Sequence, residues 1–232
     1  MTGASLELST ASCDKFMHAI QQSCHGQLVA TLRRKAWLPL AILAWAVAVG
    51  ISWKMILEYG LKSEPASPDA TSLRWPSDTN LVIVPNRPTV VFFVHPKCPC
   101  TRASLAELER LWVLRDARAN HSPQLIVVVT IPPKATSDWL TTRTVERASN
   151  LPGATLAIDP EGRVAQRFGA STSGAVMWFD AAGECRYAGG LTASRGHEGD
   201  NLGRSSLERL LRGATQPVSS IPALGCKLCL PK

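Results

Sequence analysis

An apolar stretch that ends close to two cysteines constrains this 232-residue chain more than any other feature. Residues 90–94 read Val-Val-Phe-Phe-Val, which is typical of a buried strand, and Cys98 and Cys100 follow after three residues. A helical pattern begins near Cys100 and continues to Leu114. A strand-to-helix junction places backbone N–H groups and the positive end of the helix dipole beside these cysteines. Since this environment favours the thiolate, the sequence predicts a redox-active or metal-binding pair.

The residues around the pair support this prediction. Lys97 and Arg102 add positive charge on either side, and Pro99 fixes its φ and stiffens the link between the cysteines. A disulfide across one residue closes a very small loop, so we expect it to be strained and easily reduced. We expect Cys98 to be the more exposed thiol and the nucleophile, with Cys100 resolving. An alternative register, which buries Cys100 equally well, leaves the choice of nucleophile open.

A second feature is an apolar segment of membrane-spanning length near the N-terminus. Residues 36–53 carry no charge, and the basic residues 33–35 precede them. This length suits a bilayer, and the basic flank predicts a cytoplasmic N-terminus. We therefore expect a cytoplasmic segment at 1–35, a single transmembrane anchor at 36–57 and an exported C-terminal portion. A cleavable signal peptide and a buried core helix are the alternatives.

Composition adds no sign of nucleic-acid binding. The net charge is +7, yet Lys and Arg are scattered singly apart from residues 33–35, and no nucleic-acid motif accompanies them. Near the N-terminus, Cys13, His18, Cys24 and His25 match no common zinc spacing, so we interpret both cysteines as reduced thiols without a metal role. We expect no nucleic-acid partner.

The remainder of the chain alternates between strand and helix patterns. Residues 58–79 have the composition of a linker, so we expect a domain at 80–214 and a C-terminal tail at 215–232 that is loosely structured from residue 217. The alternation, with a C-terminal hairpin and helix, predicts an α/β fold whose mixed sheet is covered on both faces. The expected strands are 81–84, 89–94, 124–130, 154–158, 174–180 and 185–188, and the expected helices after the first are 137–148, around 164–168 and around 207–211.

Three further cysteines lie in the expected exported portion. Cys185 falls on an expected strand, which predicts a small buried hydrophobe. Cys226 and Cys229 form a second dithiol, Cys-x-x-Cys, in the tail. This dithiol could pass electrons to the first pair, bind a metal or close a local disulfide, and the sequence does not choose among these roles.

Three stretches of the chain resemble the thioredoxin superfamily: residues 95–104, 158–165 and 189–201. The likeness is to the membrane-tethered TlpA/ResA-like branch, and most of all to the bacterial RedB-type proteins, over about residues 78–214. Two positions depart from the superfamily pattern. The usual Cys-x-x-Cys is Cys98-Pro99-Cys100 here, and Gly174 stands at about the place of the usual cis-proline.

The resemblance implies a thioredoxin-like fold and thiol–disulfide exchange through Cys98 and Cys100, without a cofactor. It also implies a protein of the bacterial inner membrane with a periplasmic domain, whose partners are exported cysteine-containing proteins. Copper chaperones of the same fold suggest an alternative, in which Cys98 and Cys100 bind Cu(I) with His95 or His197. A thiol peroxidase is not expected, because the Thr-x-x-Cys element of those enzymes is missing before Cys98.

Overall fold

The computed structural model describes residues 37–58, 73–115, 122–215 and 221–229. The chain divides into two compact units, Met1–Glu58 and Tyr59–Lys232. Cys13 and Cys24, for which the sequence predicts reduced thiols without a metal role, lie outside the described residues, together with the neighbouring histidines.

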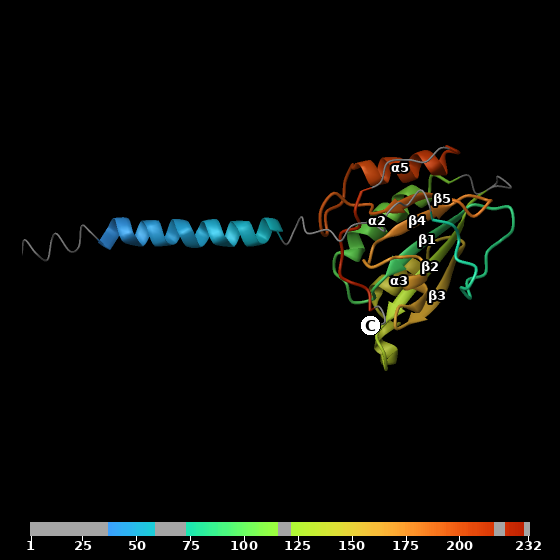
Figure 1. Ribbon diagram of the computed structural model, residues 1–232, viewed down its shortest axis with the longest axis horizontal. Helices are drawn as coiled ribbons and strands as arrows, with labels where there is room; N and C mark the ends of the chain where they lie inside the picture. The colour runs from blue at the N-terminus through green and yellow to red at the C-terminus, as the bar shows by residue number, and fades with distance from the viewer. Residues whose placement is uncertain (1–36, 59–72, 116–121, 216–220, 230–232) are drawn as a thin grey trace, which may run out of the picture. The chain divides into compact units, whose positions relative to one another are not determined.

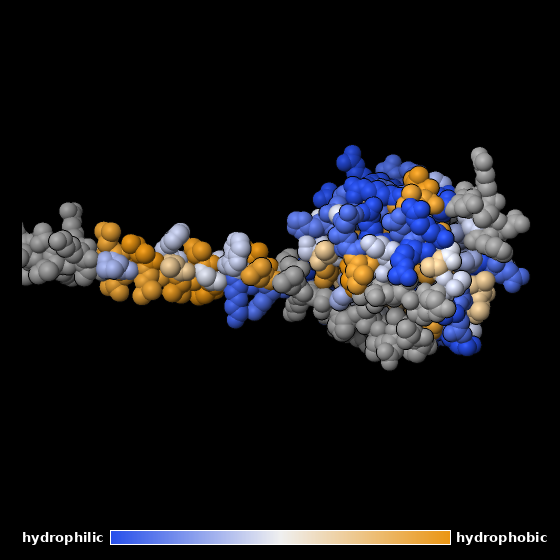
Figure 2. Space-filling model, turned by 90° about the horizontal axis from the view of Figure 1, so that it is seen from above, coloured by the Kyte–Doolittle hydropathy of each residue, from blue (hydrophilic) through white to orange (hydrophobic). Residues whose placement is uncertain are grey.

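The N-terminal unit contains an apolar helix, Trp37–Glu58. Its 22 residues include a window with a mean hydropathy of 2.0, so its length and composition suffice to cross a bilayer. Figure 2 shows apolar side chains along most of its visible face, with polar residues toward the C-terminal end. Lys54 and Glu58 form an ion pair at that end, with 3.7 Å between nitrogen and oxygen. The helix expected at 36–57 is therefore present.

A five-stranded mixed sheet forms the centre of the second unit (Figure 1). Its strands are β1 (Thr89–Val94), β2 (Gln124–Ile131), β3 (Ala154–Pro160), β4 (Val176–Phe179) and β5 (Cys185–Gly189). They lie in the order β3-β2-β1-β4-β5; β1 and β2 are parallel, as are β2 and β3, whereas β4 is antiparallel to both β1 and β5. β1 is the middle strand and is buried throughout, so the core holds the end of this strand, and the residues that follow Val94, in a defined position.

Helices cover both faces of this sheet. They are α2 (Thr101–Trp112), α3 (Arg143–Ser149), α4 (Arg163–Arg167) and α5 (Leu202–Leu211). Val90 and Phe92 of β1 pack with α2, α3 and α5, whereas Val91 and Phe93 point to the face that α4 covers. Each such buried side chain stabilises the fold by about 1.5–3 kcal/mol. The expected mixed α/β architecture is confirmed, and it fixes the strand end that precedes the cysteines.

Two expected elements differ from the structure. Residues 81–84 do not form a strand. The side chain of Gln124 bonds them instead, with its Oε1 accepting from Val84 N at 2.9 Å and its Nε2 donating to Val82 O at 2.8 Å. The single helix expected at 137–148 is split into a 3-10 turn, Ser137–Trp139, and α3. Thr142 caps α3 by accepting from Val145 N, because a threonine hydroxyl favours a helix start over a helix interior.

Both ends of the domain carry more structure than the sequence predicts. Trp75, inside the expected linker, packs with its ring centroid 5.1 Å from those of Phe168 and Phe179. Residues 221–229 hydrogen-bond to the domain, and Leu228 is buried in the core on the α4 face. The expectation of a loosely structured tail is therefore wrong for these nine residues, whose short apolar stretches are interrupted by Pro222, Gly225 and Lys227.

Candidate functional site

Cys98 and Cys100 lie between the end of β1 and the start of α2. A turn closes where Cys98 N–H donates to His95 O at 3.0 Å, and Cys100 is the N-cap residue of α2. The helix thus begins near Cys100, as expected. Cys98 is only 2% exposed whereas Cys100 is partly exposed. The expectation that Cys98 is the more exposed thiol is wrong, because the tail residue Cys226 lies against it.

Two buried hydroxyl groups connect the backbone to the Cys98 sulfur. Ser173 Oγ accepts from His95 N–H at 2.7 Å and lies 2.5 Å from Thr101 Oγ1. Because Ser173 accepts from the backbone, its own proton is available to Thr101, which leaves the Thr101 hydroxyl free to donate onward. Thr101 donates to the Cys98 sulfur through both its hydroxyl and its N–H. The fold therefore aims donors at this sulfur from the first turn of α2.

The tail supplies further donors to Cys98. Cys226 N–H donates to Cys98 Sγ at 3.3 Å, and the Cys226 thiol also hydrogen-bonds to this sulfur. Burial raises the pKa of Cys98, but the donors from Cys226 and Thr101 outweigh it and hold this pKa below its ordinary value. Burial and the adjacent Cys98 sulfur raise the pKa of Cys226 to about 12. Cys98 therefore ionises more readily than Cys226, which is a thiol at neutral pH.

Arg195 provides positive charge beside the other two sulfurs. Its guanidinium donates to Gly225 O and to the Cys100 sulfur, and its charge also acts on Cys226. Burial and the charge of Cys98 nevertheless raise the pKa of Cys100, which makes it a thiol at neutral pH. A guanidinium in this position stabilises the thiolate that Cys100 becomes whenever a disulfide to it breaks.

Lys97 and Arg102 lie at the edge of the cluster. Lys97 Nζ pairs with Asp138 at 2.6 Å and lies 4.4 Å from the centroid of the Trp139 ring. Arg102 is exposed on α2, and Pro99 is exposed between the two cysteines. Neither basic residue is among the largest causes of the pKa shifts of Cys98 and Cys100. Burial, hydrogen bonds, the neighbouring thiols and Arg195 are the main causes of these shifts.

The copper alternative needs a third ligand beside the pair. Across the part of the chain that the structure describes, no three side chains of His, Cys, Asp or Glu gather in a metal-binding arrangement. His95 packs edge-on against Trp139, with ring centroids 5.3 Å apart, and its burial lowers its pKa. His197 is exposed in a loop. The geometry thus gives no specific support to a ligand set of Cys98, Cys100 and a histidine.

The remaining two described cysteines differ from the cluster. Cys185 on β5 is 3% exposed, and its thiol donates to Tyr187 O at 3.2 Å. The prediction of a small buried hydrophobe is confirmed, and burial raises the pKa of Cys185 to about 12. Cys229 is partly exposed at the end of the described tail, and burial raises its pKa as well.

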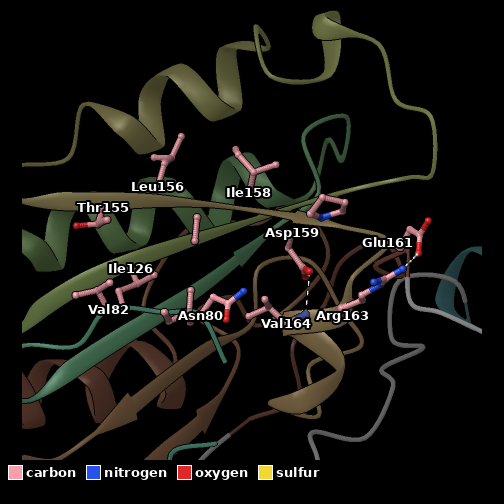
Figure 3. Close-up of a pocket in the computed structure, with 13 residues that line it drawn as sticks. Asn80, Val82, Ile126, Thr155, Leu156, Ile158, Asp159, Glu161, Arg163 and Val164 are labelled. Atoms are coloured by element: carbon pink, nitrogen blue, oxygen red, sulfur yellow. Dashed lines mark hydrogen bonds and ion pairs between the residues drawn. The ribbon is translucent and has the colours of Figure 1, made fainter. Parts of the chain in front are cut away.

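The cavity beside β3 holds no comparable chemistry (Figure 3). Its volume is about 570 Å³, and neither cysteine nor histidine lines it. Asp159, which Figure 3 shows pointing toward α4, accepts from Val164 N at 2.8 Å and Ala165 N at 3.0 Å. Glu161 pairs with Arg163 at 2.9 Å. Because these polar groups are already satisfied, the thiol cluster is the stronger candidate site.

Several residues that contact the cysteine pair could not be predicted from the sequence. Ser173 meets Thr101 across 72 residues, and Cys226 meets Cys98 across 128, distances over which no local pattern operates. No motif around Arg195 indicated that it contacts the cysteines. The one available signal was a set of glycines, because a glycine beside a strand often marks a close approach of two backbones. These glycines are Gly189, Gly190 and Gly225.

No protein-family model matches this chain, and no curated protein matches it. Among solved structures, an uncharacterized conserved protein from Geobacillus kaustophilus is 21% identical, with a TM-score of 0.50 over 75% of this chain and 95% of that chain. A hypothetical protein from Sinorhizobium meliloti 1021 is 17% identical, with a TM-score of 0.50 over 74% of this chain and 98% of that chain. A secreted Mycobacterium tuberculosis disulfide oxidoreductase is 17% identical, with a TM-score of 0.37 over 56% of this chain and 84% of that chain.

These likenesses concern the fold and not the activity, because the identities are low. Other matching structures, at TM-scores below 0.40, include thioredoxin-like proteins. The expected architecture is a mixed sheet with the cysteine pair after its central strand, and the observed order β3-β2-β1-β4-β5 has this form. The C-terminal unit therefore has the expected mixed α/β architecture, and it shares its fold with the first two structures above.

Proposed function

We propose that this protein is a membrane-anchored, exported thiol–disulfide oxidoreductase that acts through Cys98-Pro99-Cys100. One observation carries the proposal: the Cys98 sulfur accepts hydrogen bonds from Thr101 and Cys226, and its pKa lies below that of an ordinary thiol. A thiolate beside a second thiol, at the N-terminus of a helix, is the arrangement that thiol–disulfide exchange requires. A buried structural cysteine shows the opposite shift, as Cys185 does.

The reaction needs only sulfur atoms. The Cys98 thiolate attacks one sulfur of a partner disulfide, and the other partner sulfur leaves as a thiolate that takes up a proton. Cys100 then loses its proton and attacks Cys98, which releases the second partner thiol and leaves a Cys98–Cys100 disulfide. Two electrons pass to the partner, whose two thiolates take up one proton released by Cys100 and one from the solvent, and no cofactor takes part. Arg195 favours the second step because its charge stabilises the Cys100 thiolate.

The location of the domain is part of the proposal. The apolar helix Trp37–Glu58 is long enough to span a bilayer, and the basic residues 33–35 before it favour a cytoplasmic N-terminus. The domain would then lie in the bacterial periplasm, where disulfides persist. Its partners would be exported cysteine-containing proteins. Within the thioredoxin-like proteins, we place the chain in the TlpA/ResA-like branch, nearest the RedB type.

Disulfide mapping on the full-length protein in detergent tests the proposed activity. The reduced protein is mixed with oxidised glutathione, quenched with acid, alkylated and mapped by mass spectrometry. We expect a Cys98–Cys100 disulfide to form at least 100-fold faster than any bond to Cys185. Replacement Cys98→Ser should abolish it, whereas the control Cys185→Ala should leave its rate within twofold of the wild type.

Two outcomes would overturn the proposal. One is a Cys98 that reacts no faster than Cys185. The other is stoichiometric binding of Cu(I) in competition with a chelator, together with slow exchange. That second result would favour the metallochaperone alternative, with Cys98, Cys100 and His95 as ligands.

A further inference from the structure

The tail residues 221–229 are docked on the domain by backbone hydrogen bonds. Thr172 and Lys227 form an antiparallel bridge, in which Ser173 N donates to Cys226 O at 2.9 Å and Leu228 N donates to Ser171 O at 2.8 Å. Farther back, Gly190 N donates to Ile221 O at 2.8 Å. The tail therefore runs past the loop 171–173, whose Ser173 belongs to the hydrogen-bond network of Cys98.

Glycines on both sides make this docking possible. A Cβ on Gly225 would lie 2.0 Å from Ser173 O, and a Cβ on Gly190 would lie 2.6 Å from Pro222 O. A Cβ on Gly189 would lie 2.4 Å from Ile221 O. Because real Cβ contacts are never this short, any other residue at these positions would push the tail away. The tail thus has a cradle shaped to receive its backbone.

The extended backbone of the tail decides where its side chains point. Successive side chains of an extended segment alternate between two faces. Leu228 is buried in the domain core and Lys227 is exposed, so Cys226, two residues before Leu228, also faces the domain. There its N–H and its thiol both contact the Cys98 sulfur. The bridge thus delivers one tail cysteine to the candidate nucleophile.

We propose that Cys226 and Cys229 are an internal redox partner of Cys98 and Cys100, so that a disulfide moves between the two pairs in a transfer that begins while the tail is docked and ends with its release. This inference rests on the proposed function, because it assumes that Cys98 and Cys100 form a disulfide. It assigns to the tail dithiol the first of the roles that the sequence left open. We call Cys98 and Cys100 the helix pair, and Cys226 and Cys229 the tail pair.

The transfer balances without any outside reagent. When the helix pair carries the disulfide, Cys226 loses its proton and attacks the Cys98 sulfur; the Cys98–Cys100 bond breaks and Cys100 leaves as a thiolate that takes up a proton. Cys229 then loses its proton and attacks Cys226, so Cys98 leaves as a thiolate. Two electrons have passed from the tail pair to the helix pair; one of the two protons released by the tail is taken up by Cys100, and the other goes to the solvent because Cys98 is left as a thiolate. Arg195 lies beside both Cys100 and Cys226, the two thiolates formed at the first step.

Closing the tail disulfide also releases the tail. Two positions three residues apart in an extended segment are separated by about 10 Å and lie on opposite faces, whereas a disulfide requires Cα atoms within about 7 Å. Cys226 and Cys229 therefore cannot be joined while the bridge at Lys227 holds. An oxidised tail leaves the cradle and uncovers the reduced Cys98, which then meets a partner disulfide. An external protein dithiol reduces the tail and allows it to dock again.

A trapping experiment on the full-length protein tests this inference. Replacements Cys100→Ser and Cys229→Ser remove the cysteines that resolve each step, so the intermediate should accumulate. After addition of oxidised glutathione, we expect a Cys98–Cys226 disulfide in more than 80% of the chains by peptide mapping. Adding Gly225→Ala to this variant should slow the cross-link at least tenfold, and adding Cys226→Ser should leave Cys98 as its glutathione adduct.

The possible results separate the two proposals. Stable glutathione adducts on both Cys98 and Cys226, without the cross-link, would overturn the internal transfer even if the wild type still forms its Cys98–Cys100 disulfide. A cross-link in a protein whose wild type forms no Cys98–Cys100 disulfide would leave the contact intact and overturn the oxidoreductase itself. Formation of the cross-link at an unchanged rate with Gly225→Ala would overturn the docking that we infer.

Discussion

The helix pair and the tail pair consist of the same residue type, yet the fold holds them very differently. Cys98 and Cys100 follow the middle strand of the sheet and open a 12-residue helix, so their positions are fixed by the core. Cys226 and Cys229 belong to a short segment held by one antiparallel bridge and a few buried side chains. The helix pair is therefore suited to preorganised chemistry, and the tail pair to binding and release.

The two pairs also differ in the pKa values of the cysteines that meet, Cys98 and Cys226. The pKa of Cys98 is lowered although burial raises it, because Cys226 and Thr101 donate hydrogen bonds to the sulfur. The pKa of Cys226 is raised by burial and by Cys98. A contact that stabilises the charge on one sulfur thus suppresses the charge on the other. The reactivity of Cys98 therefore depends on its contact with Cys226, and variants that alter this contact should change it.

The largest effect is expected in hydrogen exchange of the docked tail. Leu228 N–H donates to Ser171 O in the docked state. In a fully oxidised protein, in which Cys226 and Cys229 form a disulfide, this N–H should exchange at least 100-fold faster, while the exchange rates of β1 stay unchanged. Exchange followed by mass spectrometry on the oxidised and reduced protein measures both regions. Equal protection of the tail in both forms would mean that closing its disulfide does not undock it.

Replacement Gly225→Ala should expose Cys98 without touching a cysteine. The added Cβ would meet Ser173 O at 2.0 Å, so the tail must shift. We expect the alkylation rate of Cys98 to rise about tenfold, which corresponds to about 1.4 kcal/mol of lost docking. Gly50→Ala, where a Cβ meets nothing within 4 Å, is the matched control. An unchanged rate would show that the tail does not cover Cys98.

Replacement Thr101→Val should raise the pKa of Cys98. The variant keeps the shape of the side chain but removes one donor to the thiolate, so a smaller fraction of Cys98 is ionised at neutral pH. The rate of alkylation rises with pH, and its midpoint should move to higher pH in the variant. Thr144→Val, at a buried threonine of α3, should leave the midpoint where it is. A midpoint that falls in Thr101→Val would contradict the donor role.

Replacement Arg195→Gln should slow the resolution of mixed disulfides. The guanidinium beside Cys100 favours its thiolate, so its loss should lengthen the lifetime of a Cys98–glutathione adduct by about three- to tenfold. Stopped-flow mixing with quench and mass spectrometry measures this lifetime. Arg209→Gln on the exposed side of α5 controls for loss of one positive charge, and an equal effect there would remove the specific role of Arg195.

The smallest effects are expected at Lys97 and Arg102, which the sequence singled out for their charge. Lys97 is paired with Asp138, and Arg102 is exposed. Replacements Lys97→Gln and Arg102→Gln should each change the alkylation rate of Cys98 by less than twofold, since exposed charges are strongly screened. A fivefold loss in either variant would restore the role that the sequence suggested.

The sequence predicts the centre of the fold well because the centre depends on local patterns. The continuous apolar runs of β1 and β2 indicate buried parallel strands, and the cysteines at the junction with α2 follow directly from them. Residues 81–84 show the limit of this reasoning: they are apolar, yet no neighbouring strand accepts them, and Val82 remains 79% exposed. Apolar content alone does not provide a pairing partner.

The candidate site could be predicted only in part for a related reason. Cys98 and Cys100 were found from their own surroundings in the chain. They are contacted by Ser173, Arg195 and Cys226, which lie 70 residues or more away in the sequence. These contacts require close approaches of two backbone segments, which glycines permit. The composition of the tail indicated a loose segment, because the apolar side chains that dock it are interrupted by Pro222, Gly225 and Lys227.

A residue-resolved titration of the reduced, full-length protein tests the central claim most directly. Alkylation rates of each cysteine are measured by mass spectrometry across pH, and the midpoint of each curve gives its pKa. Our account predicts the lowest midpoint for Cys98, below that of an ordinary thiol, with Cys100 and Cys226 both above it. A Cys98 that titrates at or above the midpoint of Cys100 would contradict its assignment as the attacking thiolate.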